Sequence, residues 1–312
     1  MVHHLLYYSS GTIIPFGQRV LENKGLGVVH APGGLHTDGF VLRDSDTPPR
    51  HKKTVSVVIC SLGRLDSLKT TLWSLVEQTY KDFEVILITD KGNLSELRQR
   101  GLQSSQAAYV SFIDDDVRCE PTWLQAIVET FEKDWKVVGV TGPTVITEEY
   151  RQNRDSFKFK AFKHLYEILF LDGLGKRPSY LSKCGANSWA SNDCETSYEG
   201  EAGYLEACNF TIKREVPLDN FGFSKRYEST GEWHEVDFAL RLKKKGKLWY
   251  SQKAKVYHRP SQKGVYKARL ATAHRWRNFM RFQKRWVKPS IRTFLYRGFV
   301  WLYFRMKEVR MI

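Results

Sequence analysis

The chain has 312 residues, 42% of them hydrophobic, so it can bury a full core in one large domain or two modest ones, which excludes a disordered protein. Five cysteines without a CxxC spacing indicate neither a zinc site nor a complete disulfide framework, and favour a reducing compartment. The first residues lack the pattern of a signal peptide. The sequence has no run of about 18 apolar residues, so we expect no transmembrane helix.

The net charge of +15 is concentrated near the C-terminal end. Residues 261–312 carry 14 Lys or Arg and a single acid, so they account for +13 of the total. The first 260 residues are therefore nearly neutral. We expect an almost neutral globular body followed by a basic segment.

Strands alternate with helices over the first half of this body. Residues 1–52 carry turn signals without a sustained period, which predicts an irregular arm or short hairpins. The strands predicted after them are 54–60, 83–89, 109–113 and 137–142, and the helices are 65–76, 95–106 and 124–131. This order predicts an α/β fold with a parallel, doubly wound sheet, which binds ligands at the carboxyl ends of its strands.

Three adjacent carboxylates, Asp114, Asp115 and Asp116, follow the third strand in the sequence YVSFIDDDVRCEP. Neighbouring carboxylates repel unless a cation neutralises them, and hard ions such as Mg²⁺ or Mn²⁺ suit their oxygens. The alternative is that Asp116 caps a helix beginning at Pro121. Ser61 also falls at a strand end, as does Asp90, so one crevice is expected to collect these side chains and the metal interpretation is favoured.

With these segments in order, residues 54–260 resemble the family 2 glycosyltransferases, which have the GT-A fold and use nucleotide-sugar donors. The resemblance rests on VSVVICSLGRLDSLKTTLWSLVEQTYKDFEVILITD, on RQRG and on FIDDDVRCEPTWL. It implies donor-binding roles for Ser61, Arg64, Asp90 and Arg98. The turn CSLGR lacks the usual proline, and Gln99 stands where the family has asparagine.

The resemblance also implies roles within the acidic run. Asp116 is expected to bind Mn²⁺ or Mg²⁺, and Asp114 to contact the ribose directly or through water. Alternation in an extended segment puts these two side chains on one side and Asp115 on the other. Asp115 is grouped with the donor-binding residues. A cation at this point would offset the charge of a departing nucleoside diphosphate.

The second half supplies an acid-base candidate in GEWHEVDFALRLKKKG, which resembles the helix that carries the family's catalytic base. The register puts Glu235 at the base position and Asp237 at the following acid, with His234 where a glutamate is usual. Alternatively, both acids favour a helix N-terminus and Asp237 pairs with Arg241 one turn on. His258, after a short strand, is implied to join the metal or the diphosphate, with a structural role as the alternative.

Two further segments have open roles. Residues 151–204 show no clean period and are expected to form a binding loop, where Trp189 stacks on a sugar or simply packs. Aromatic and basic residues interleave in 266–280 and 291–311, which predicts two helices separated at Pro289. These helices are expected to lie on an anionic membrane; packing on the catalytic domain is the alternative, and nucleic-acid binding is the least favoured.

Together these observations predict an inverting, metal-dependent glycosyltransferase that moves a sugar to a hydroxyl on a glycan or lipid-linked saccharide. A UDP-sugar is the first expectation for the donor. The expected parts are an irregular arm (1–52), a GT-A domain (53–260) with a nucleotide half (53–142) and an acceptor half (143–260), and a basic helical extension (261–312). The location is expected to be cytoplasmic, peripheral to a membrane. A nucleotidyltransferase and a non-catalytic membrane-associated adaptor with a degenerate transferase domain are the alternatives.

Overall fold

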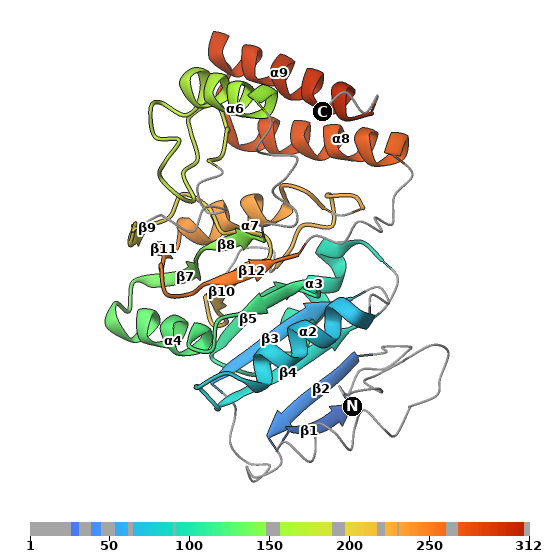
Figure 1. Ribbon diagram of the computed structural model, residues 1–312, viewed down its shortest axis with the longest axis vertical. Helices are drawn as coiled ribbons and strands as arrows, with labels where there is room; N and C mark the ends of the chain where they lie inside the picture. Colours follow the sequence, from blue (N-terminus) through green and yellow to red (C-terminus); the bar gives the residue numbers. More distant parts are fainter. Residues whose placement is uncertain are drawn as a thin grey trace.

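The computed structural model shows strands at the centre with helices on both sides (Figure 1). The residues that it describes are 26–30, 39–44, 54–61, 65–89, 92–147, 157–188, 197–216, 222–229, 231–259 and 268–308.

Within these residues, nine strands form one sheet in the order β1-β2-β4-β3-β5-β10-β7-β11-β9. Its central strands β4, β3 and β5 are parallel neighbours, and β7 pairs in parallel with β11. The strand β10 runs antiparallel between β5 and β7, so β5 and β7 still share one direction. The strands are β1 Leu26–His30, β2 Gly39–Asp44, β3 Val55–Cys60, β4 Phe83–Ile88, β5 Tyr109–Asp114, β7 Val137–Thr141, β9 Gly200–Glu201, β10 Asn209–Lys213 and β11 Lys247–Tyr250.

A smaller sheet in the described chain lies at the carboxyl end of β5. It has the order β6-β12-β8, with bounds β6 Val117–Cys119, β8 Thr144–Ile146 and β12 Val256–His258. β12 pairs antiparallel with β6 and parallel with β8. Because His258 pairs with Val117, this sheet carries the histidine back to the acidic run.

Helices cover both faces of the large sheet, which confirms the expected doubly wound arrangement. On one face α2 (Leu65–Val76) and α4 (Trp123–Lys133) bury Leu72 and Trp123 in one core cluster with residues of the strands. On the other face α3 (Leu94–Ser104) and α7 (His234–Lys243) bury Leu97 and Phe238. The apolar, β-branched strands fit this two-sided burial.

The close packing of α3 on the sheet explains why the RQRG motif ends in a glycine, Gly101. A Cβ built at this position would lie 2.2 Å from Cγ1 of Val58 on β3, so any side chain there would push the helix off the sheet. The glycine therefore lets α3 approach the strands closely and holds Arg98, three residues earlier, near the end of β5.

Three further helices form a separate layer at the end of the molecule opposite β1 and β2 (Figure 1). They are α6 (Phe157–Phe170), α8 (Ala268–Trp286) and α9 (Ile291–Glu308). Their shared core includes Tyr166, Phe170, Phe279 and Tyr296. The two C-terminal helices are as expected, but the expectation of a loop over 151–204 is wrong where α6 forms. Helix α6 has apolar side chains on two faces, which obscures its period.

Helix α8 also packs against α7 and the loops beside the large sheet. Its Phe282 is fully buried and stacks on Trp233 with ring centroids 4.7 Å apart. Glu228 accepts hydrogen bonds from Arg277 (2.7 Å) and Arg281 (2.5 Å). Packing on the domain, one of the alternatives for the basic segment, is therefore what α8 does.

The described part of the N-terminal segment forms two paired strands, which agrees with the expectation of short hairpins and not with an irregular arm. β1 and β2 pair antiparallel, and β2 extends the large sheet by pairing with β4. The predicted domain boundaries stay predictions. Among the described helices, none combines the length and apolar character needed to cross a membrane.

Candidate active site

The three aspartates at the end of β5 have different surroundings. Asp114 is partly exposed, whereas Asp115 is 0% exposed and Asp116 is 7% exposed. Ser61 Oγ donates a 2.5 Å hydrogen bond to Asp115 Oδ2, as the pairing of Cys60 with Asp114 permits. These contacts fit a brace between β3 and β5 better than the predicted donor-binding roles of Ser61 and Asp115, which stay predictions.

Asp116 contacts the predicted second metal ligand, His258. Nε2 of His258 lies 3.2 Å from Oδ1 of Asp116, and the backbone N–H of Arg259 donates to the Asp116 carbonyl at 2.9 Å. Burial lowers the pKa of His258, but the adjacent Cys208 sulfur and the Asp116 carboxylate outweigh it, so the pKa is raised. These surroundings of His258 favour a positive charge at the site. Either a proton on the imidazole or a bound cation can supply that charge.

Cys208 is a neighbour that the sequence did not predict. β10 runs antiparallel to β5 with Asn209 opposite Ile113, so Cys208, just before β10, lies beside Asp114. Ligand atoms of Asp114, Cys208 and His258 all lie within 4.8 Å of one another. No local pattern marks Cys208, because an antiparallel insertion between distant segments puts it there.

This donor set fits a divalent cation. Carboxylate oxygens and imidazole nitrogens suit Mn²⁺, and Mg²⁺ accepts the oxygens. Asp114 and His258 belong to the converging group, and Asp116 adjoins it through its 3.2 Å contact with Nε2 of His258. The thiol of Cys208 is softer than these ions prefer, and burial raises its pKa against the opposing effect of His258. Cys208 therefore belongs beside the cation position and is the weakest of the four as a ligand.

Arg98 connects the acidic run to α7. Its buried guanidinium donates to Asp114 Oδ1 at 2.9 Å and to the Ala207 carbonyl at 2.6 Å. A third hydrogen bond joins it to His234 Nε2 at 3.1 Å. Since a guanidinium can only donate, Nε2 accepts, and the His234 proton is on Nδ1.

The Nδ1 side of His234 faces the predicted base. Nδ1 lies 3.0 Å from Glu235 Oε2 and 2.5 Å from the Gly231 carbonyl. Burial raises the pKa of Glu235, but the His234 hydrogen bond and the charge of Arg98 outweigh it, so the pKa is lowered. Asp114, Arg98, His234 and Glu235 thus form one continuous chain of polar contacts, which we call the relay.

The relay residues on α7 are held by the backbone and by α8. Trp233, which precedes His234, has a left-handed backbone with φ of 75°, a strained conformation for a tryptophan. Its indole stacks on Phe282 of α8. The packing of α8 therefore fixes the start of α7, where Glu235 lies.

Asp237 has a different environment from Glu235. It is 0% exposed, and Oδ1 accepts a 2.7 Å hydrogen bond from Trp286 Nε1 while Oδ2 accepts one from Arg241 Nε at 3.2 Å. Arg285 also lies 3.2 Å from Oδ1. This geometry fits the structural alternative, pairing with Arg241, and its predicted catalytic role stays a prediction.

Three predicted residues, Arg64, Asp90 and Trp189, lie outside the described residues.

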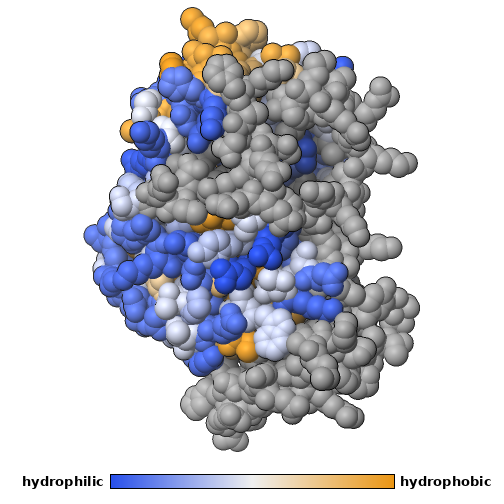
Figure 2. All heavy atoms as spheres, in the orientation of Figure 1, coloured by the Kyte–Doolittle hydropathy of each residue, from blue (hydrophilic) through white to orange (hydrophobic). Residues whose placement is uncertain are grey.

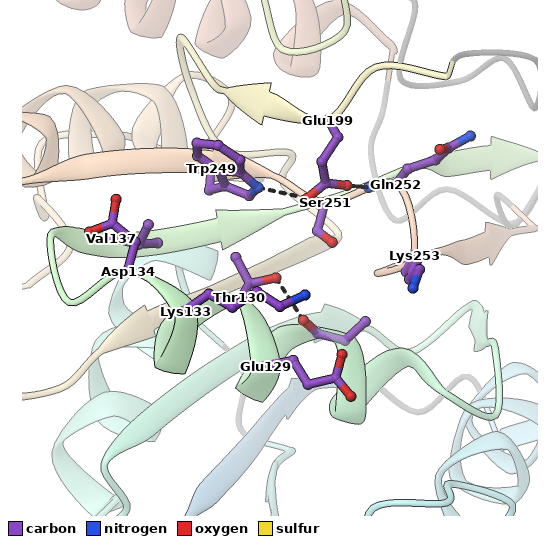
Figure 3. Close-up of a pocket in the computed structure, with 11 residues that line it drawn as sticks. Glu129, Thr130, Lys133, Asp134, Val137, Glu199, Trp249, Ser251, Gln252 and Lys253 are labelled. Carbon is purple, nitrogen blue, oxygen red and sulfur yellow. Dashed lines mark hydrogen bonds between the residues drawn. The ribbon is translucent and has the colours of Figure 1, made fainter.

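A separate groove of about 490 Å³ lies between α4 and β11 (Figure 3). Within it, Glu199 accepts hydrogen bonds from Trp249 Nε1 at 2.7 Å and the Gln252 backbone at 2.8 Å. None of the sequence-predicted site residues lines this groove.

Comparison with known proteins identifies the enzyme class of the chain. The profile of the family "Glycosyl transferase family 2" matches residues 89–184, which include the acidic run. A "Glucosyl-dolichyl phosphate glucuronosyltransferase" of Haloferax volcanii is 24% identical over 242 residues, 66% of this chain and 69% of the relative. The protein is a glycosyltransferase. The resemblance to family 2 is thereby confirmed.

Two more comparisons extend this result to the glycosyltransferase fold. A "Cholesterol galactosyltransferase" of Borreliella burgdorferi is 29% identical over 110 residues, 27% of this chain and 31% of the relative. The crystal structure of "GalNAc-T7 with UDP, GalNAc and Mn2+" superposes with a TM-score of 0.52 and 12% identity, over 75% of this chain and 48% of that one. The expected GT-A type fold is confirmed.

Proposed function

We propose that this glycosyltransferase moves a sugar from a nucleotide sugar, a UDP-sugar as first candidate, to a hydroxyl of a lipid-linked acceptor, with inversion at the anomeric carbon. The observation that carries the proposal is the relay, which joins the acidic run to Glu235. The structural neighbour that contains UDP and Mn²⁺ supports the donor and cation. The two relatives, whose names include dolichyl phosphate and cholesterol, support a lipid acceptor.

In this mechanism Asp116 and His258, with Asp114 beside them, would hold a divalent cation. A bound Mn²⁺ or Mg²⁺ supplies positive charge against the diphosphate oxygens. Asp114 orients the donor and is itself fixed by Arg98. Because buried carboxylates, a histidine and an arginine surround this point, the leaving group meets groups already oriented before the donor arrives.

Glu235 acts as the general base. Its carboxylate takes the proton of the acceptor hydroxyl, the freed oxygen bonds to the anomeric carbon, and the bond from that carbon to the diphosphate oxygen breaks with its electron pair leaving on the nucleoside diphosphate. Attack from the face opposite the leaving group inverts the centre. The lowered pKa of Glu235 keeps it deprotonated and ready at neutral pH.

The Asp116→Asn variant tests this proposal. The substitution preserves size and removes one charge, so Mn²⁺-dependent binding of nucleoside diphosphate should weaken about 10- to 100-fold and transfer should fall with it. Calorimetry with a panel of nucleotide sugars, with and without Mn²⁺, measures the binding. Asp66→Asn, at a fully exposed acid on α2, is the matched control.

Unchanged metal-dependent binding of nucleotide by the Asp116→Asn variant would show that the cation does not bind at Asp116. The same calorimetry separates the alternatives. A non-catalytic adaptor should bind no nucleotide sugar in a metal-dependent way, and a nucleotidyltransferase should release pyrophosphate from a nucleoside triphosphate. The glycosyltransferase relatives favour neither.

A further inference from the structure

The layer of α6 and α9 exposes an unusual amount of apolar surface. Ten large hydrophobic side chains are exposed among the described residues, and nine of them lie on α6, the turn after it and α9. Figure 2 shows apolar residues gathered at this end of the molecule. We call these nine the α6–α9 face: Leu165, Ile168, Leu169, Leu174, Ile291, Phe294, Leu295, Trp301 and Leu302.

Core packing does not account for the outer side of α9. Tyr296 and Val300 face inward and are buried, whereas Ile291 is 83% exposed and Phe294 is 75% exposed. Ile291 precedes Phe294 by three residues, and the pairs Phe294–Trp301 and Leu295–Leu302 are each seven residues apart, so the exposed positions form a stripe along the solvent side. An exposed apolar stripe on a rigid helix marks an interaction surface.

The face is fixed before any partner arrives. Arg292 of α9 donates to the Leu169 carbonyl at 2.7 Å and pairs with Asp172, which links α9 to the end of α6. Phe162 stacks on Phe299 with centroids 4.7 Å apart. A groove of about 300 Å³, lined by residues that include Leu295, runs between the two helices.

Charge identifies the kind of partner. α6 carries three Lys and one Glu, and α9 carries four Lys or Arg and one Glu. Lys288, just before α9, is exposed as well. Within this layer Lys163 pairs with Glu167 and Arg292 with Asp172. In α8, four arginines pair with acids of the catalytic domain: Arg275, Arg277, Arg281 and Arg285.

We propose that the α6–α9 face docks peripherally on an anionic lipid bilayer. Its apolar side chains enter the interface while exposed basic side chains beside them, Lys160, Lys288 and Arg305, meet the acidic headgroups, as interfacial helices do. A second copy of the chain is disfavoured as the occupant, because two identical basic faces would repel each other. The earlier expectation that both C-terminal helices lie on the membrane is thus narrowed to α9, joined by α6. This inference does not depend on the proposed donor or acceptor.

Flotation of the full chain with lipid vesicles tests the inference. The wild-type protein should float with phosphatidylcholine vesicles that contain phosphatidylserine, and binding should weaken in their absence and as salt increases. The double variant Phe294→Glu, Leu302→Glu should lose at least about tenfold in partitioning. Trp135→Glu is the matched control, because Trp135 is 78% exposed but lies outside the face, and it should bind like the wild type.

Two results would overturn the inference. One is equal vesicle binding by the double variant and the control. The other is a wild-type dimer, seen by light scattering, that the double variant converts to a monomer without any vesicle binding by either. Donor hydrolysis in solution, measured on the same proteins, should be unchanged in the double variant, and thermal melting should confirm that it is folded.

Discussion

At the scale of single residues, His234 is the link on which the proposed base depends. Its Nε2 accepts a hydrogen bond from Arg98 and its Nδ1 faces Glu235. The ring therefore connects Arg98, which bonds the acidic run, to the base on α7. A histidine in place of the family's usual glutamate can do this only in one neutral tautomer. Arg98 enforces that tautomer because it has no acceptor atom.

The pH dependence of transfer should reveal this link. His234→Leu removes the hydrogen bond that helps to lower the pKa of Glu235, so the acid limb of kcat/KM should move to higher pH. The sign follows because the base must be deprotonated to act. In His234→Gln the amide oxygen can accept from Arg98 and the amide nitrogen can donate to Glu235, so the acid limb should stay near that of the wild type.

A profile that is the same in all three proteins would show that His234 does not act on Glu235. Glu235→Gln is the companion variant, expected to lower kcat by roughly 10²- to 10⁴-fold with little effect on donor binding. Retention of donor binding separates a lost base from a lost fold.

At the scale of elements, α8 attaches to the catalytic domain through Glu228. Hydrogen bonds from Arg277 and then Arg281 lower the pKa of this carboxyl from 4.5 to about 2, and the backbone of Glu228 bonds the Asn278 side chain. Trp233 and Asp237 add contacts to the same helix. The helix that braces the active site is therefore held by both charge and packing.

Glu228→Gln should lower the free energy of unfolding by about 1 kcal/mol at neutral pH, a modest value because solvent screens the pairs. The folded pKa lies below the ordinary one, so this stabilisation is complete above pH about 4.5 and is lost as the pH falls toward 2. Urea unfolding at several pH values measures it. Glu232→Gln, which removes a single pairing to Arg275, should cost less. A pH-independent difference between Glu228→Gln and wild type would contradict this account.

At the scale of the whole molecule, β10 brings distant segments to one edge of the sheet. It runs antiparallel between β5 and β7 and puts Cys208 beside Asp114, while β12 returns His258 to Asp116. The end of the molecule formed by α6, α8 and α9 lies beyond α7 (Figure 1). A protein that docks through the α6–α9 face would thus keep α8 between the lipid surface and the catalytic domain.

Local sequence patterns predicted the parts that local physics determines. The alternation of buried strands and helices, the acidic run after β5 and the pairing of Asp237 with Arg241 follow from short-range periodicity and spacing. The relay was not predictable, because Arg98 and His234 are 136 positions apart and meet only through the fold. Helix α6 was missed because apolar residues such as Leu165 and Ile168 lie on its exposed side as well as on its buried side, which obscures the period.

The most direct test of the central claim is anomalous diffraction from crystals grown with Mn²⁺ and a nucleoside diphosphate. The account predicts a manganese peak at bonding distance from Asp116 and His258, with diphosphate oxygens completing its coordination. Nucleotide bound at this edge of the sheet without a manganese peak beside these two residues would contradict it.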